Sequence, residues 1–137
     1  MSGPDLISSG VVLLLVLTIA WGGTFLLRVV SGAVGTNELQ QIYFRAGHAH
    51  AGVLVILGLV VRLLLVDVPL PGWLAPLPSL VLYAAVLMPA GFFLSVIGRN
   101  PARPNRLRYL IYAGAGLLGI GLAAAGVGLI MAGVQAV

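Results

Sequence analysis

The sequence predicts an all-α polytopic membrane protein, a bundle of four transmembrane helices with both chain termini external. Three observations predict this fold class. About 61% of the 137 residues are hydrophobic and only 7% are charged, whereas roughly a quarter of the residues of a soluble domain are charged. The apolar residues form four runs of about the 20 residues that a helix needs to cross a bilayer. Arginines gather in the loops on one side of these runs.

The first predicted span, residues 6–30, follows the segment MSGPD. This segment lacks the basic residues that begin a signal peptide, and the apolar run after it is too long for one, so we expect the span to be retained. The second span covers residues 42–66. Its helix can begin earlier, because Asn37, Glu38 and Gln40 form a helix-start pattern with an acid in the first turn.

Prolines separate the second span from the third. The four in the segment VPLPGWLAPLP cannot all lie within one helix, because each lacks an N–H donor and clashes with the preceding turn. We therefore predict an external loop at residues 67–78, with Trp73 at the membrane interface, and a third span at residues 79–98. Pro89 lies inside this span and predicts a kink but no break, since neighbouring helices can cover the carbonyl that it frees. The fourth span covers residues 107–134.

The arginines predict the orientation, because basic residues are retained preferentially on the cytoplasmic side. Placing loops 31–41 and 99–106 inside leaves only Arg62 toward the outside. We expect an integral protein of a prokaryotic plasma membrane with external termini. A nucleic-acid partner is a poor interpretation, because the basic residues do not spread along a groove-sized face. Four arginines of the second inner loop act as a topology signal or bind anionic lipid headgroups: Arg99, Arg103, Arg106 and Arg108.

Glycines in the fourth span predict close helix packing, which replaces hydrophobic association inside a lipid bilayer. They form two rows with a spacing of seven residues, and the rows lie about 140° apart around the helix. Two faces can therefore meet neighbouring backbones, one inside the protomer and one in a second copy. We expect self-association through this span, although glycine is common in transmembrane helices generally. The rows are Gly114, Gly121 and Gly128, and Gly119, Gly126 and Gly133.

The segment YFRAGHAHAGVL contains the only two histidines of the chain, and ionisable groups within a span indicate a functional site. His48 and His50 lie about 4 to 8 Å beyond Arg45, in the inner leaflet. Glu38, Gln41, Arg45 and His48 are spaced by three, four and three residues, so they form a polar track on one helix face. His50 lies about 200° around the helix from His48. The pair therefore cannot chelate one ion from a regular helix.

Counting inward from the cytoplasmic ends brings other polar side chains to the height of the histidines. Hydroxyls and imidazoles are available there, and no carboxylate lies within any predicted span. This excludes hydrolysis by paired carboxylates and a four-ligand catalytic zinc site within one protomer. We identify no catalytic residue, which favours a non-enzymatic role. The expected polar layer is Thr24, His48, His50, Ser95 and Tyr112.

Three functions stay open for the histidines. They can ligate haem b or a divalent metal between two subunits or helices, and Arg45 supports this by favouring the neutral imidazole that binds metal. The RxxHxH arrangement is similar to histidine-bearing helices of membrane haem proteins, which favours haem over zinc. His48 can instead serve a proton or small-solute channel or transporter, although the outer half of the second span has no further polar track. Both histidines can also be packing groups of a structural interaction subunit.

Overall fold

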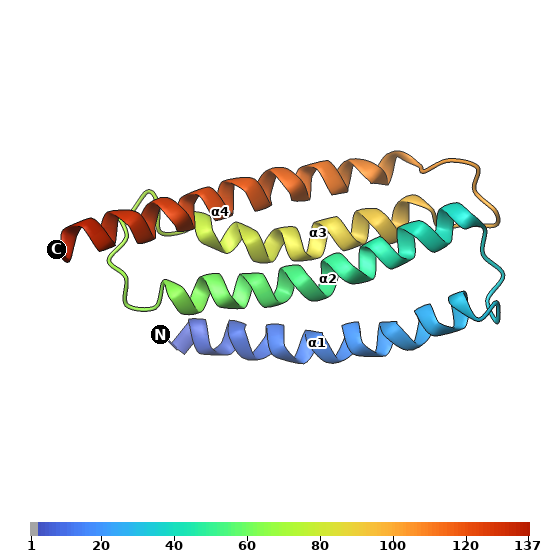
Figure 1. The fold of residues 1–137 in the computed structure, drawn as a ribbon, viewed down its shortest axis with the longest axis horizontal. Helices are drawn as coiled ribbons and strands as arrows, with labels where there is room; N and C mark the ends of the chain where they lie inside the picture. The colour runs from blue at the N-terminus through green and yellow to red at the C-terminus, as the bar shows by residue number, and fades with distance from the viewer. Residues whose placement is uncertain (1–2) are drawn as a thin grey trace.

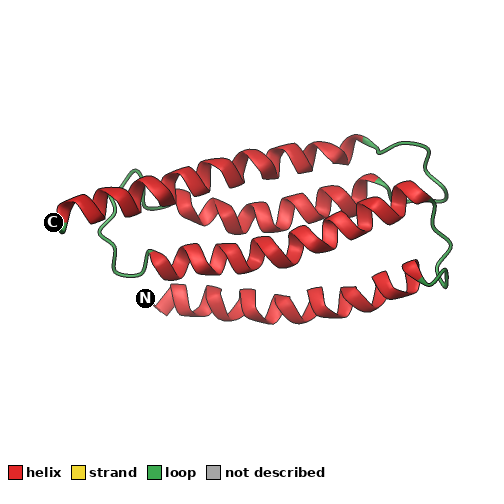
Figure 2. Ribbon diagram, in the orientation of Figure 1, coloured by secondary structure: helices red, strands yellow, loops and turns green. Residues whose placement is uncertain are grey.

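The computed structural model describes residues 3–137, which form four α-helices (Figures 1 and 2). All four are long and apolar enough to cross a bilayer, when the turn that precedes the third is counted with it. The predicted all-α fold with four spans is confirmed, and the chain is an integral membrane protein. The helices are α1 (Gly3–Val30), α2 (Glu38–Leu64), α3 (Leu80–Ser95) and α4 (Tyr109–Gln135), and 3-10 turns at Leu77–Ser79 and Arg106–Arg108 precede α3 and α4.

The helices lie side by side in the order in which they occur in the chain (Figure 1). α3 packs against both α2 and α4, whereas α1 packs mainly against α2. Both termini lie at one end of the helices with the loop that joins α2 to α3, and the other two loops lie at the opposite end. We call the end with the arginine-rich α3–α4 loop the inner end and the end with the termini the outer end, after the predicted orientation.

A capping box sets the start of α2, four residues before the predicted span. The side-chain oxygen of Asn37 accepts a hydrogen bond from the backbone N–H of Gln40 at 2.9 Å, and the side-chain oxygen of Gln40 accepts one from the backbone N–H of Asn37 at 3.2 Å. This reciprocal pair satisfies two backbone donors that the helix itself leaves unpaired. The helix-start pattern at Asn37 therefore marks the true beginning of α2.

Two other helix boundaries differ from the prediction. α3 ends at Ser95 and not near Gly98, because Gly98 and Asn100 both adopt positive φ angles, 124° and 52°, which a right-handed helix does not allow. α1 begins at Gly3, so Asp5 lies inside its first turn and one carboxylate does belong to a membrane helix. α3 runs unbroken through Pro89, as expected.

The α3–α4 interface is built on glycines. Gly91 of α3 is buried against α4, and a Cβ added to it would lie 2.7 Å from the backbone nitrogen of Ile111. Gly121 of α4 is buried against α3, and an added Cβ would lie 3.0 Å from the backbone nitrogen of Val81. Real Cβ atoms almost never come within 3.0 Å of such atoms. The two helices therefore approach each other more closely than alanine at these positions would allow.

A small apolar cluster lies at the middle of the helices. Its buried members are Leu54 and Val55 of α2 with Ala85 and Met88 of α3, and side chains of α1 and α4 pack around them. Elsewhere the helices expose many large apolar side chains, and none of the most apolar window of α1 is buried. This distribution suits a protein whose outer surface contacts lipid tails.

Candidate functional site

His48 lies at the interface between α2 and α1. Its half-buried imidazole faces two glycines of α1. A Cβ added to Gly22 would lie 3.8 Å from Nδ1 of His48, and one added to Gly23 would lie 3.7 Å from Nε2. These are ordinary van der Waals distances, so alanine would fit at either position and the ring does not require glycine there.

His50 projects from another side of α2 and contacts α3. Its Nδ1 atom lies 2.7 Å from the carbonyl oxygen of Ala46, one turn earlier in the same helix. Its ring lies against Phe92 of α3, with centroids 5.0 Å apart and planes inclined by 32°. A carbonyl oxygen can only accept a hydrogen bond, so Nδ1 must carry the proton. In the neutral imidazole, Nε2 then holds the lone pair.

The two histidines therefore do not share one site within the protomer. Among residues 3–137, no group of three or more histidine, cysteine, aspartate or glutamate side chains is placed to hold a metal ion. Gly47, between the histidines, is buried, and a Cβ added to it would lie 2.9 Å from the ring of Phe93. The small residues at this point thus admit the aromatic rings of α3.

The residues of the predicted polar track lie at the inner end of α2, but their side chains do not form a connected chain. Arg45 is exposed, and its Nε donates to the backbone oxygen of Gln41 at 3.2 Å. Glu38 is exposed in the first turn of the helix, and Gln41 is half-buried. His48, at the end of the track, turns toward α1. In the described part of the chain, no hydrogen bond joins side chains of the track to one another.

The sequence placed the neighbouring Gln40 only in a helix-start pattern and did not reveal its contacts with the loop after α3. Gln40 is 6% exposed, and its side-chain NH₂ donates to the backbone oxygens of Val96 at 3.1 Å and Gly98 at 3.0 Å. Asn37 makes a similar link, because its NH₂ donates to the side chain of Asn100 at 2.9 Å and to the backbone oxygen of Pro101 at 2.8 Å. The capping box of α2 thus also ties the two inner loops together.

The residues of the expected polar layer do not form one hydrogen-bonded group within residues 3–137. The Thr24 hydroxyl donates to the carbonyl of Trp21 at 2.6 Å, and the buried Ser95 hydroxyl donates to the carbonyl of Phe92 at 3.3 Å. Each bond lies within one helix. Tyr112 is 67% exposed and has Tyr109 as its aromatic neighbour, with ring centroids 6.2 Å apart.

The two glycine rows of α4 have different surroundings. Gly114, Gly121 and Gly128 are buried, the first two against α3 and Gly128 against side chains of the outer loop. The other row meets open space, because a Cβ added to any of its members would have no atom within 4 Å beyond its own helix. One predicted packing face is therefore used within the protomer. The open row is Gly119, Gly126 and Gly133.

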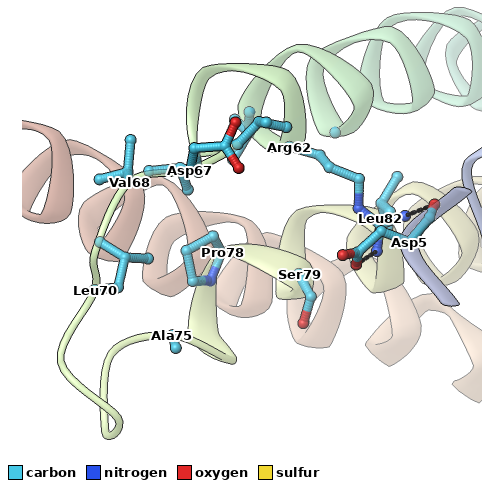
Figure 3. Close-up of a pocket in the computed structure, with 13 residues that line it drawn as sticks. Asp5, Arg62, Asp67, Val68, Leu70, Ala75, Pro78, Ser79 and Leu82 are labelled. Atoms are coloured by element: carbon cyan, nitrogen blue, oxygen red, sulfur yellow. Dashed lines mark hydrogen bonds and ion pairs between the residues drawn. The ribbon is translucent and has the colours of Figure 1, made fainter. Parts of the chain in front are cut away.

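A second polar cluster, which sequence reasoning also missed, lies at the outer end between α1 and α2 (Figure 3). Arg62 of α2 forms an ion pair with Asp5 of α1, with Nη2 3.7 Å from the carboxylate, and its Nη1 donates to the Asp5 backbone oxygen at 3.2 Å. Nη1 also donates to the hydroxyls of Ser8 and Ser9. This Arg62 cluster borders a cavity of about 520 Å³ between α2, α3 and the outer loop.

We expect Arg62→Met to loosen the outer end of α1. Methionine keeps the apolar stem but removes the ion pair and three hydrogen bonds that join α1 to α2. A hydrogen bond to a charged group contributes about 1.5–3 kcal/mol, and partial exposure of the cluster favours the lower figure. Amide exchange in the first two turns of α1 should therefore rise about tenfold, while α3 and α4 stay unchanged.

The matched control for this experiment is Asp5→Asn. It removes the ion pair but leaves the bonds from Arg62 to the Asp5 backbone oxygen and to both serines, so exchange should rise less than in Arg62→Met. Unchanged exchange in Arg62→Met would show that the cluster does not hold α1.

Comparison of the chain with protein-family models, curated proteins and solved structures finds no match. The fold and the placement of individual residues therefore carry the functional argument.

Proposed function

We propose that this protein is a membrane subunit of a prokaryotic plasma membrane that holds a metal-containing cofactor, haem b in the first place, through Nε2 of His50. The observation that carries the proposal is the 2.7 Å contact between His50 Nδ1 and the Ala46 carbonyl. Metal-ligating histidines typically donate their second ring N–H to such an acceptor, which fixes the tautomer and leaves the other nitrogen for the metal.

The surroundings of His50 support a single oriented donor. The tilted contact with the Phe92 ring restrains the imidazole. A single imidazole would suit a haem, whose porphyrin brings its own nitrogen donors, better than a zinc site that needs four protein or water ligands. His48 faces α1, so we propose that a second histidine for the same group would come from another copy of the chain. The open glycine row of α4 offers such a copy a face for close packing.

Permeation through one protomer receives less support. The α1 side chains Val12, Val16 and Ile19 pack against the buried cluster of Leu54 and Val55, between His48 toward the inner end and the Arg62 cluster at the outer end. An apolar seam of this kind offers water and protons no hydrogen-bonding partners. A purely structural role for both histidines is the remaining alternative.

The absorption spectrum of the detergent-purified protein tests the proposal. We expect a Soret band in the wild type, loss of at least nine-tenths of it in His50→Ala, and retention in His48→Ala, because only His50 has its Nδ1 proton held by a carbonyl. In His50→Gly, added imidazole should restore the band by occupying the vacated space. A colourless wild type without bound metal, or a band that depends on His48 alone, would contradict the proposal.

A further inference from the structure

A hollow of about 480 Å³ opens at the inner end of the protein, beside the start of α4. Its lining includes three arginine side chains and contains no carboxylate. The fourth arginine of the same loop, Arg99, does not line it. The lining residues are Arg103, Pro104, Asn105, Arg106, Arg108 and Tyr109.

Asn105 gives this hollow a defined shape. Its backbone N–H donates to the carbonyl of Ser95 at 2.7 Å, and its side-chain NH₂ donates to the carbonyl of Leu94 at 2.9 Å. Its side-chain oxygen accepts a hydrogen bond from the backbone N–H of Leu107 at 2.8 Å. The loop is thereby fixed to the end of α3, and the 3-10 turn that carries Arg106 and Arg108 begins at a set position.

The charges of the hollow all favour an anion. Arg103, Arg106 and Arg108 are exposed. Their guanidinium groups stay hydrated and accessible until an anion makes contact with them. The guanidinium carbon of Arg108 lies 5.5 Å from the ring centre of Tyr109, which restrains this side chain through a cation–π contact. The fork of N–H donors of a guanidinium matches the oxygens of a phosphate group.

We propose that Arg103, Arg106 and Arg108 form a binding site for a phosphate group, carried by an anionic phospholipid of the inner leaflet or supplied as free phosphate. The hollow adjoins the start of a membrane-spanning helix, which is the depth of lipid headgroups. Basic residues close to an anionic leaflet each strengthen binding by about fivefold. The site is separate from His50 and does not depend on the proposed cofactor.

Arg99 provides a matched control, because it has the same charge in the same loop but does not line the hollow. We would titrate phosphatidylglycerol and, separately, phosphatidylcholine into the protein in neutral detergent and count bound lipids by native mass spectrometry. Inorganic phosphate forms a third arm of the experiment. Wild type, R99Q, R103Q and R106Q should all retain the same helical circular dichroism, since every substituted side chain is exposed.

The wild type should bind phosphatidylglycerol in preference to phosphatidylcholine. R103Q and R106Q should each weaken this binding about fivefold, and R99Q should leave it within twofold of the wild type. If inorganic phosphate displaces the lipid and binds with the same variant pattern, free phosphate is a ligand of the site; if it does neither, the ligand is the lipid headgroup. Equal weakening by R99Q and R106Q, or no preference for phosphatidylglycerol, would overturn the proposal, because general charge attraction would then explain the binding.

Discussion

Replacing Gly91 with alanine is expected to lower the free energy of unfolding by about 2–3 kcal/mol, the upper range for overpacking a core. The added Cβ would lie 2.7 Å from both the backbone nitrogen and Cγ1 of Ile111. The Ile111 side chain can change rotamer, but its backbone nitrogen cannot move unless α4 moves. The substitution therefore has to separate α3 from α4, and this separation affects their whole contact.

Gly116→Ala, which lies outside both glycine rows, is the matched control for this effect. It makes the same chemical change on α4, at a position where an added Cβ has no atom within 4 Å beyond its own helix. We expect its unfolding free energy to stay within about 0.5 kcal/mol of the wild type. Reversible unfolding by a denaturing detergent in mixed micelles, followed by circular dichroism, measures both variants. Equal stability of Gly91→Ala and Gly116→Ala would contradict the described α3–α4 contact.

The substitution Gln40→Glu is expected to destabilise the inner end by about 3 kcal/mol at neutral pH. Glutamate has nearly the same shape as glutamine but replaces the NH₂ group with a second oxygen. This oxygen would face the carbonyl oxygens of Val96 and Gly98, which now accept from Gln40 at 3.1 and 3.0 Å. Because the position is 6% exposed, water cannot restore the lost hydrogen bonds.

The pH dependence of this variant gives a sharper test than its stability alone. A protonated carboxyl group can donate one of the two hydrogen bonds, so the folded state favours protonation and the destabilisation should shrink as the pH falls. The control is Gln41→Glu at the next position. The Gln41 side chain is half-buried and lies one turn before Arg45, so we expect its free energy of unfolding to change by at most about 0.5 kcal/mol. A pH-independent loss in Gln40→Glu would contradict the described bonds to the loop.

Hydropathy was sufficient to predict four spans, because lipid imposes one requirement on every segment that crosses it. The local signal at Asn37 also predicted the early start of α2. The end of α3 at Ser95 could not be read in this way, because the next two residues, Val96 and Ile97, are apolar and extend the hydropathy signal up to Gly98, which has a positive φ angle. Periodicity found both glycine rows of α4, but only the folded neighbours show which row packs.

The contacts of the polar residues were harder to predict, because the height of a residue in the membrane does not show which neighbour its side chain points toward. Thr24 and Ser95 donate to carbonyls of their own helices, as short hydroxyl side chains commonly do, so they need no partner on another helix. Counting inward from the inner ends alone also left the outer ends uncompared. Asp5 and Arg62 come to the same height only when they are counted from the observed helix ends, Gly3 and Leu64.

The position of α1 bears on how the protein is made. α1 precedes the other three helices in the chain, so it leaves the ribosome before α2, its main neighbour. Its most apolar window is the most apolar of the four and has no residue buried by protein, so lipid alone can accommodate this helix while translation continues. Asp5, Ser8 and Ser9 also precede Arg62 in the chain, so the hydrogen-bonding partners of its guanidinium are synthesised first.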